Sequence, residues 1–388
     1  MLEIVYICGK DLNRILRKME KQENQQRLQS LDALRGFDMF FIMGGGAIFV
    51  ALATLFPYPF FETIAKQMEH VEWNGFAFED MIFPLFLFIA GISFPFSLAK
   101  QRSKGMTDSA IYKKIVRRGI TLVILGLIYN GFLRFDFENF RCASVLARIG
   151  LAWMFAALIF INTTTKQRIG IVSVIFIGYW LLLQFVPAPD GNGDPFSMEG
   201  CLVGYIDRLF LPGKLYKGIH DPEGILSLIP AIGTALLGMF SGELIKLKRE
   251  GLTDVKKVLY LLAGGAFLLV VGLLWNFVFP INKNLWSSSF ACFVGGISMM
   301  LFALFYYIVD VKNCRKWTLF FRVIGMNSIT IYIAQGFINF RYTSNALFGG
   351  LASLFPETAQ PLVLAIGYVL VCWGFLYFLY RQKIFLKV

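Results

Sequence analysis

The sequence predicts an all-α polytopic membrane protein with about ten transmembrane helices and both termini in the cytoplasm. Of its 388 residues, 57% are hydrophobic, 16% are aromatic and only 16% are charged, and the mean hydropathy is +0.62. The apolar residues form long continuous runs, which approach the roughly 20 residues that a helix needs to cross a bilayer. Because no water reaches the bilayer core to bond open backbone groups, these runs must be helices.

Ten apolar runs follow one another along the chain. They cover residues 34–56, 80–99, 119–133, 144–161, 169–186, 225–245, 258–279, 285–309, 318–337 and 362–380. The run 119–133 is short for a crossing, but without it every later loop would change sides of the membrane. The cation-rich segment 246–257 would then lie outside, against the positive-inside rule, so ten crossings are the better prediction.

The distribution of cations supports this topology. Of the 37 Lys and Arg residues, 27 fall in segments predicted to be cytoplasmic and 8 in segments predicted to lie outside. The net charge of +12 therefore reflects topology and contact with anionic membrane lipid, and does not indicate nucleic-acid binding. We interpret residues 1–30 as a cytoplasmic tail and residues 31–388 as the transmembrane domain. The polar segment 187–224 is predicted to be an outer loop, long enough to act as a lid or binding element.

The segment between the first two runs contains the strongest candidate for chemistry. His70, one of only two histidines, stands just before the turn Trp73-Asn74-Gly75, and Asp80 lies at the mouth of the second run. An imidazole titrates near neutral pH and can exchange a proton during a reaction. We therefore interpret His70 as a candidate catalytic residue. Asp80 either caps the second helix or orients His70, and the sequence leaves both roles open.

Other polar residues lie in or beside the runs, where lipid disfavours them. Arg35 and Asp38, one helical turn apart, are expected to pair at the inner mouth of the first run, either as a functional group or as a simple helix anchor. Arg148 and Arg322 are close enough to an interface to extend toward water. Asn327 either hydrogen-bonds to another helix or lines a cavity.

The segment PINKNLW, residues 280–286, begins a helix at the outer face. Its Asn282 and Lys283 offer hydrogen-bond donors to a polar substrate. Trp286 is either part of the same site or an anchor at the membrane interface.

The basic cluster of residues 113–118 adjoins the third run. Its four cations are Lys113, Lys114, Arg117 and Arg118. They either set the topology or bind a phosphorylated cofactor, because the two roles have the same sequence pattern.

The cysteines and histidines do not predict a metal site. The six cysteines have no CxxC or other metal-ligand spacing, and neither histidine has a partner at ligand spacing. Cys142 and Cys201 both fall in predicted outer segments, where a disulfide and two free thiols are both open alternatives.

Seven motifs, in one order from Asp32 to Tyr332, resemble a known family. They are SLDALRGFDM with the following GGG, HVEWNGFAFEDMIFPLFLFIAG, GYIDRLFL, HDPEGILS, PINKNLWSSSF and GMNSITIYI. The family is that of the lysosomal heparan-α-glucosaminide N-acetyltransferase and its bacterial relatives. The resemblance implies transfer of an acetyl group from cytosolic acetyl-CoA, through the membrane, to an amino sugar on the far side.

The resemblance also implies roles for particular residues. The active-site histidine of the family precedes its WNG turn, and His70 matches it. Asp80 is then its catalytic partner, with His70 acting either as a general base or as an acetylated nucleophile. The donor would be held at the inner face by Arg35 and the basic cluster. The expected acceptor-binding residues are Trp73, Asn74, Asp221, Glu223, Asn282, Lys283, Trp286 and Asn327.

The chain departs from the family at three places. No part of this sequence is expected to correspond to the lumenal N-terminal domain or the additional first helix of the lysosomal member. Ile42-Met43 stands where the lysosomal member has an active-site asparagine before GGG, and Ala334-Gln335-Gly336 replaces a histidine-containing motif. The compact form suggests a bacterial cytoplasmic membrane protein, and a homodimer is an open arrangement. The alternative function is a secondary transporter of a sugar or amino sugar, although the chain lacks the internal symmetry typical of transporters.

Overall fold

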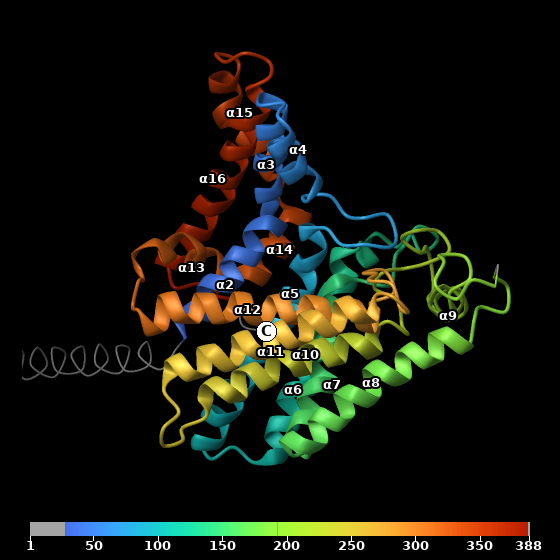
Figure 1. Cartoon of the computed structure of the whole chain (residues 1–388). Coiled ribbons are helices and arrows are strands. Elements are labelled where there is room, and N and C mark those ends of the chain that lie inside the picture. The colour runs from blue at the N-terminus through green and yellow to red at the C-terminus, as the bar shows by residue number, and fades with distance from the viewer. Residues whose placement is uncertain (1–27, 192, 387–388) are drawn as a thin grey trace, which may run out of the picture.

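The computed structural model describes residues 28–191 and 193–386. Most of the predicted tail, residues 1–30, lies outside this range. Within the described residues all regular elements are helical, and the only β-type pairing is an isolated bridge between Arg141 and Gly213. The predicted all-α class is therefore confirmed (Figure 1).

The helices have the following order and bounds. They are α2 (Gln29–Phe40), α3 (Gly46–Leu55), α4 (Pro59–Lys66), α5 (Phe78–Ser103), α6 (Asp108–Tyr129), α7 (Val145–Asn162), α8 (Thr165–Phe185), α9 (Leu202–Phe210), α10 (Leu228–Lys246), α11 (Asp254–Trp275), α12 (Ser288–Tyr306), α13 (Leu319–Met326), α14 (Ser328–Phe337), α15 (Phe340–Ala352) and α16 (Gln360–Arg381). The other helical elements of the described residues are four short 3₁₀ or π segments: Phe41–Gly45, Phe132–Arg134, Tyr307–Val311 and Lys316–Thr318.

Eight of the described helical segments are long and apolar enough to cross a membrane, or nine if the bent pair at 316–337 is one span. Each of the ten predicted runs coincides with a helix, and the one left out of this set is α6. Its first half carries the basic cluster, so the helix lacks an uninterrupted apolar stretch. The protein is an integral membrane protein, while ten crossings and cytoplasmic termini stay predictions.

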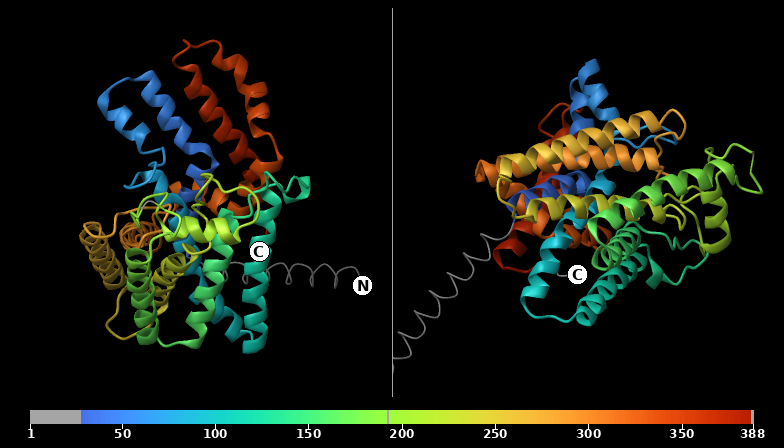
Figure 2. Two further views of the ribbon diagram at one scale, coloured as in Figure 1. Left: turned by 90° about the vertical axis from the view of Figure 1, so that its right-hand side faces the viewer. Right: turned by 60° about the horizontal axis from the view of Figure 1, so that its bottom comes forward.

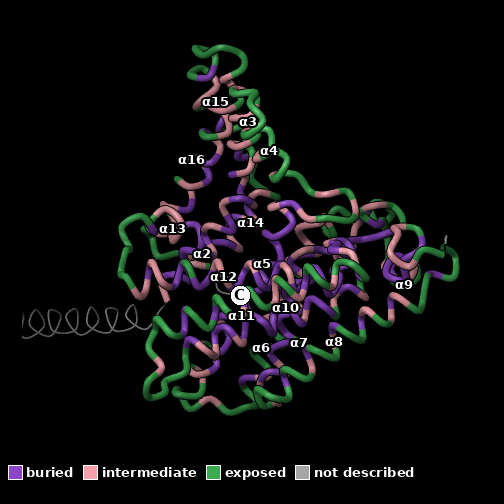
Figure 3. Tube along the Cα trace, in the orientation of Figure 1, coloured by how far each residue is buried: buried purple, intermediate pink, exposed green. Residues whose placement is uncertain are grey.

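Helix α5 lies at the centre of the bundle and packs on α10, α2, α7 and α12 (Figure 3). Glycines allow α5 and α10 to approach closely: a Cβ added at Gly91 would lie 2.3 Å from the carbonyl oxygen of Ala235. The same addition at Gly238 would lie 2.1 Å from the carbonyl oxygen of Phe88. Small residues at such contacts are typical of membrane helices. By contrast, less than a third of the apolar stretch of α8, α11 and α16 is buried, as expected for helices that face lipid.

The first predicted run is kinked rather than straight. A π segment at Phe41–Gly45 separates α2 from α3, and Gly44 has φ +110°, which residues with a side chain rarely adopt. The amide of Gln335 donates to the carbonyl oxygen of Met43 at 3.3 Å and to the hydroxyl of Tyr368 at 2.9 Å. Gln335 thus bonds a backbone oxygen beside the kink.

Two helical hairpins, α3–α4 and α15–α16, project from the same side of the bundle (Figures 1 and 2). The predicted run 318–337 also differs from a straight helix, because its two halves meet at Asn327 with a bend of 56°. Sequence hydropathy does not distinguish a kinked span from a straight one.

Candidate functional site

Three interhelical segments meet around His70: 67–77 before α5, the long segment 186–227 that contains α9, and 276–287 before α12. Gly75 donates its amide to the carbonyl oxygen of Ile281 at 2.8 Å. The Asn282 side-chain amide donates to the Asn74 side-chain oxygen at 3.0 Å. The predicted WNG and PINKNLW motifs therefore form one structural unit, although they lie about two hundred residues apart in the chain.

His70 and Asp80 form the central pair of the site. Nδ1 of His70 lies 2.8 Å from Oδ1 of Asp80. The second carboxylate oxygen accepts hydrogen bonds from the backbone amides of Ala77 at 3.1 Å and Val71 at 3.4 Å. Asp80 thus fills both of the roles that the sequence left open, since it caps α5 and orients the imidazole. The Asp80 side chain is 1% exposed, whereas that of His70 is 55% exposed and can reach a substrate.

Lys283 completes this cluster. Its Nζ lies 3.3 Å from Oδ1 of Asp80, and 3.1 and 3.3 Å from Nδ1 and Nε2 of His70. The side chain is 13% exposed. Burial lowers the pKa of Lys283 below its usual range, although the Asp80 carboxylate acts in the opposite direction. The sequence placed Lys283 at the outer face but gave no indication of its contact with His70.

Trp73 packs against the second histidine. Its indole donates to the carbonyl oxygen of Phe196 at 2.7 Å, and its ring meets that of His220 edge to face with centroids 5.1 Å apart. His220 is 0% exposed and neither ring nitrogen has a hydrogen-bond partner among the described residues. Burial lowers the pKa of His220 to about 3, so the ring is neutral near pH 7. His220 therefore belongs to the packing of the loop.

Asn282 and Trp286 point into the protein. Asn282 is fully buried, and its side-chain oxygen accepts the amide of Leu285 at 2.9 Å. Trp286 is 1% exposed, and its indole donates to the hydroxyl of Thr234 at 3.1 Å. The interpretation of Trp286 as an interface anchor is wrong because the ring is in the core. Asn327 is likewise buried at the break between α13 and α14. Acceptor contacts from these three residues stay predictions.

Asp221 and Glu223 share one cation, Arg141, which the sequence analysis missed. Arg141 donates to both oxygens of Asp221, at 2.8 and 2.6 Å, and also to Glu223. Asp221 is 0% exposed. Burial by itself would raise the pKa of Asp221, but the hydrogen bonds from Arg141 hold it below its usual value. In the structure the carboxylate of Asp221 is bound by Arg141. A direct contact between Asp221 and the acceptor stays a prediction.

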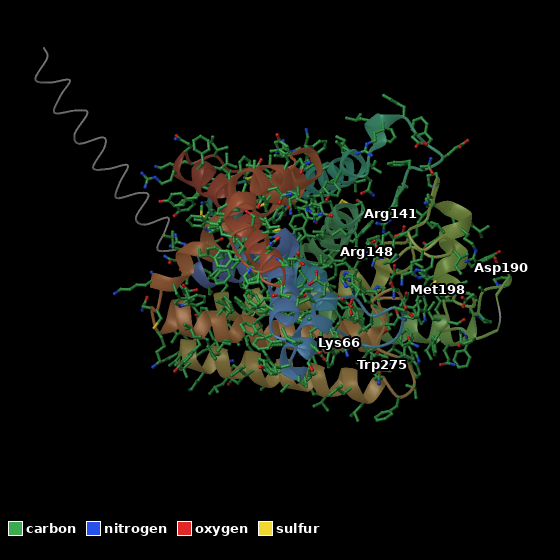
Figure 4. All side chains as sticks on the ribbon, turned by 90° about the horizontal axis from the view of Figure 1, so that it is seen from above. Lys66, Arg141, Arg148, Asp190, Met198 and Trp275 are labelled. Atoms are coloured by element: carbon green, nitrogen blue, oxygen red, sulfur yellow. The ribbon has the colours of Figure 1, made fainter. Side chains whose placement is uncertain are left out.

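Two further buried charges lie beneath the long outer segment. Asp207 on α9 accepts the amide of Ile225 at 2.9 Å through Oδ1, but Oδ2 has no hydrogen-bond partner among the described residues. Burial raises the pKa of Asp207 to about 7. Arg148 does not extend to water, since it is 2% exposed and donates to the carbonyl oxygen of Gly224 at 3.1 Å. Figure 4 shows Arg141 and Arg148 between the bundle and the loop that carries Asp190 and Met198.

On α2, the predicted pair of Arg35 and Asp38 is wrong. Arg35 instead donates to the hydroxyl of Ser93 on α5 at 3.0 Å and lies 3.6 Å from Asp32. Asp38 is 0% exposed and neither carboxylate oxygen has a hydrogen-bond partner among the described residues. One helical turn brings residues i and i+3 to the same face, but rotamers and neighbouring helices decide whether they pair.

The basic cluster divides into two parts. Lys113, Lys114 and Arg117 are exposed on α6. Arg118 turns inward, with its guanidinium 4.3 Å from the ring centroid of Trp153, close enough to Arg35 for the two charges to repel. A small apolar cavity of about 20 Å³ lies among α2, α5, α7 and α14. It is lined by Met39, Ile42, Phe83, Phe86, Val145, Leu146, Ile149, Ile329 and Tyr332.

Of the two alternatives for the outer cysteines, the structure contains free thiols at Cys142 and Cys201. Cys201 is fully buried and burial raises its pKa to about 11. In the part of the chain that the structure describes, no three His, Cys, Asp or Glu side chains are grouped as metal ligands.

Comparison with known proteins identifies the family. The model of the catalytic region of heparan-α-glucosaminide N-acetyltransferase matches residues 27–259, which include His70, Asp80 and Asp221. The chain belongs to this family. It is 27% identical to the human heparan-α-glucosaminide N-acetyltransferase over 93% of its own length and 60% of the human protein. The mouse protein is also 27% identical, over 95% of this chain and 61% of the mouse protein. The chain thus spans about three fifths of the curated relatives' length.

Proposed function

We propose that the chain is a transmembrane acetyltransferase that moves an acetyl group from cytosolic acetyl-CoA to the amine of a glucosamine-type amino sugar on the outer side. The His70–Asp80 pair supports this proposal most directly, because it joins a reactive imidazole to an orienting carboxylate at a polar mouth. The family supports an acyltransferase, since the relatives are named as N-acetyltransferases. A transporter has no comparable support from these findings.

The chemistry follows from the hydrogen bond to Asp80. Nδ1 of His70 carries the proton that Asp80 accepts, so Nε2 keeps a lone pair for the substrate. As a general base, Nε2 takes a proton from the acceptor amine while the amine nitrogen bonds to the acetyl carbon. The carbon–sulfur bond then breaks and CoA leaves as the thiolate, which takes a proton from water on the cytosolic side. In the alternative, Nε2 itself carries the acetyl group between donor and acceptor.

The two substrates would bind at opposite faces. Arg35, Lys113, Lys114, Arg117 and Arg118 are the proposed contacts of the CoA phosphates, and the interhelical segments around His70 are the proposed acceptor site. The apolar cavity among α2, α5, α7 and α14, about 20 Å³, holds no more than a water-sized group. For the pantetheine arm to reach His70 through this cavity, the helices that line it would have to separate. The bacterial cytoplasmic membrane is the proposed location, with membrane lipid around the bundle and a homodimer still open.

Acetyl transfer by purified protein tests the function. Labelled acetyl-CoA and glucosamine are supplied to the protein in detergent or nanodiscs, and N-acetylglucosamine is measured. Product formation that needs the protein is expected. Uptake of unmodified amino sugar into sealed proteoliposomes, without acetylation, would instead support a transporter.

Cysteine labelling tests the two-sided arrangement. A single cysteine at Lys104, in a background without native cysteines, should resist a membrane-impermeant maleimide in intact cells, because segment 100–118 is predicted to be cytoplasmic. A cysteine at Asp190 in the outer segment should react and serves as the matched control. Modification at position 104 from outside would overturn the topology and with it the proposed entry of the donor.

A further inference from the structure

The position of Lys283 relative to the His70 ring is unusual. Its Nζ is nearly equidistant from the two ring nitrogens, at 3.1 Å from Nδ1 and 3.3 Å from Nε2. A point in the ring plane that met both distances would collide with Cε1, which lies between the two nitrogens. The ammonium therefore lies over a face of the ring. It does not occupy the direction of the Nε2 lone pair, which stays open to a substrate.

The charges around the imidazole oppose one another. Asp80 lies 2.8 Å from Nδ1 and favours the protonated ring, and Glu79, the preceding residue of α5, acts in the same sense. Lys283 favours the neutral ring, and it also lies 3.3 Å from Asp80, so its charge cancels that of the carboxylate. Lys217, from the long outer segment, adds a second positive charge near Lys283 and Asp80. The Lys283 side chain is only 13% exposed, whereas the His70 side chain is 55% exposed, so water partly screens the charges that act on the ring.

We propose that Lys283 is a positioning residue for the acetyl-transfer reaction, which offsets the charge of Asp80 so that His70 stays neutral while Asp80 still fixes its tautomer. This inference rests on the proposed function. A carboxylate alone would orient the imidazole but would also stabilise the imidazolium, which has no lone pair to accept a proton. The buried ammonium over the ring offsets the stabilisation of the imidazolium, while Asp80 still orients the ring.

The same contact assists the return of His70 to its starting state. When Nε2 takes a proton from the acceptor amine, the ring becomes an imidazolium beside the Lys283 ammonium. The like charges repel, and the 55% exposure of the His70 side chain lets the proton pass to water at the outer mouth. The amine proton is thus released outside, while the electron pair of the broken carbon–sulfur bond leaves with CoA.

The pH dependence of acetyl transfer tests the inference. Lys283→Met keeps most of the side-chain volume but removes the charge, so Asp80 would favour the imidazolium. We expect the acid limb of the kcat/KM profile to move upward by about one pH unit. The position of this limb tests the inference, whereas kcat on the alkaline plateau and the acceptor KM show whether Lys283 also contacts the acceptor. Lys283→Arg, which keeps the charge, should restore the wild-type limb.

A second variant separates charge balance from misfolding. In an Asp80→Asn background Lys283 still repels the imidazolium directly, so adding Lys283→Met should again move the acid limb upward, although activity is lower. Size-exclusion profiles and thermal unfolding of each variant show whether the protein is intact.

Two results would overturn the inference and leave the proposed function in place. One is a Lys283→Met enzyme with an unmoved acid limb. The other is an equal loss of activity at every pH together with a raised acceptor KM, which would make Lys283 a substrate contact. Absence of acetyl transfer by the wild type at any pH would instead overturn the proposed function itself.

Discussion

In the loop cluster before α5 and α12, His70, Asp80 and Lys283 lie within 3.3 Å of one another, whereas Lys113, Lys114 and Arg117 stand exposed on α6, at the face predicted to be cytoplasmic. The sequence indicates both regions as candidate functional sites, because each carries charged residues beside a predicted membrane span. The outer charges have fixed partners and are mostly buried, so they suit a reaction that needs defined geometry. The inner charges suit attraction of a flexible anion such as a phosphate chain. Charge marks both regions, but only burial and pairing tell their roles apart.

The largest expected effect is the loss of the outer imidazole. His70→Ala should reduce acetyl transfer by about 10²–10⁴-fold, because it removes the proposed proton acceptor. The ring is half exposed, so the protein should still fold and insert. The measurement is product formation per milligram of protein with normal thermal unfolding. His220→Asn is the matched control and should keep most of the activity, since that ring only packs against Trp73. Wild-type rates in His70→Ala would remove the site assignment.

The next largest effect is expected from the loss of the buried ion pair between Arg141 and Asp221. Arg141→Met would leave Asp221 buried without its cation, and breaking such a pair costs about 3 kcal/mol or more. Local unfolding of segment 186–227 should therefore increase, measured as faster amide hydrogen exchange there and in α9. Arg134→Met is the control, because Arg134 is an exposed cation in the segment between α6 and α7 that also carries Arg141. It should leave exchange unchanged. Equal exchange in both variants would show that the Arg141 network does not hold the loop.

The buried acid and histidine beneath the loop predict a pH dependence. The pKa of Asp207 in the folded protein is raised from 3.8 to about 7, so the folded loop loses stability as pH rises through that window. The folded pKa of His220 is lowered from 6.5 to about 3, so the folded loop loses stability as pH falls below 6.5. Between pH 4 and 6.5 the two slopes oppose each other.

Single variants should reveal each slope. Asp207→Asn should make hydrogen exchange of segment 186–227 rise as pH is lowered from 6.5 to 4, after correction for intrinsic exchange, because only the His220 contribution remains. His220→Asn should show the reverse, with a more protected loop at the lower pH. If Asp207→Asn behaves like the wild type across this range, the two groups do not govern docking of the loop.

The smallest effect concerns the inner face. Lys113→Glu combined with Lys114→Glu should raise KM for acetyl-CoA several-fold while KM for the amine stays nearly constant, because exposed ion contacts contribute weakly. The pair Lys246→Glu and Lys248→Glu, at the C-terminal end of α10 and just beyond it, is the control and should change neither constant. An equal change in both constants for the α6 pair would favour one shared cavity over separate faces.

Local sequence determined much of this protein. Long apolar runs require helices, because a bilayer offers no other partner for the backbone. His70 and Asp80, only ten residues apart, could be recognised together because the turn and the helix start that position them are local features. The same holds for the cations of α6, whose distribution follows the positive-inside rule.

Tertiary structure decided which charges meet. Lys283 reaches His70 across 213 positions and Arg141 reaches Asp221 across 80, and no local pattern encodes such contacts. The predicted pair of Arg35 and Asp38 was wrong because Arg35 bonds Ser93 on α5, a partner on another helix that spacing within α2 cannot reveal. Hydropathy fixes which segments leave water, but the burial and mutual approach of their polar side chains depend on how the helices pack, and that packing sets the chemistry of the site.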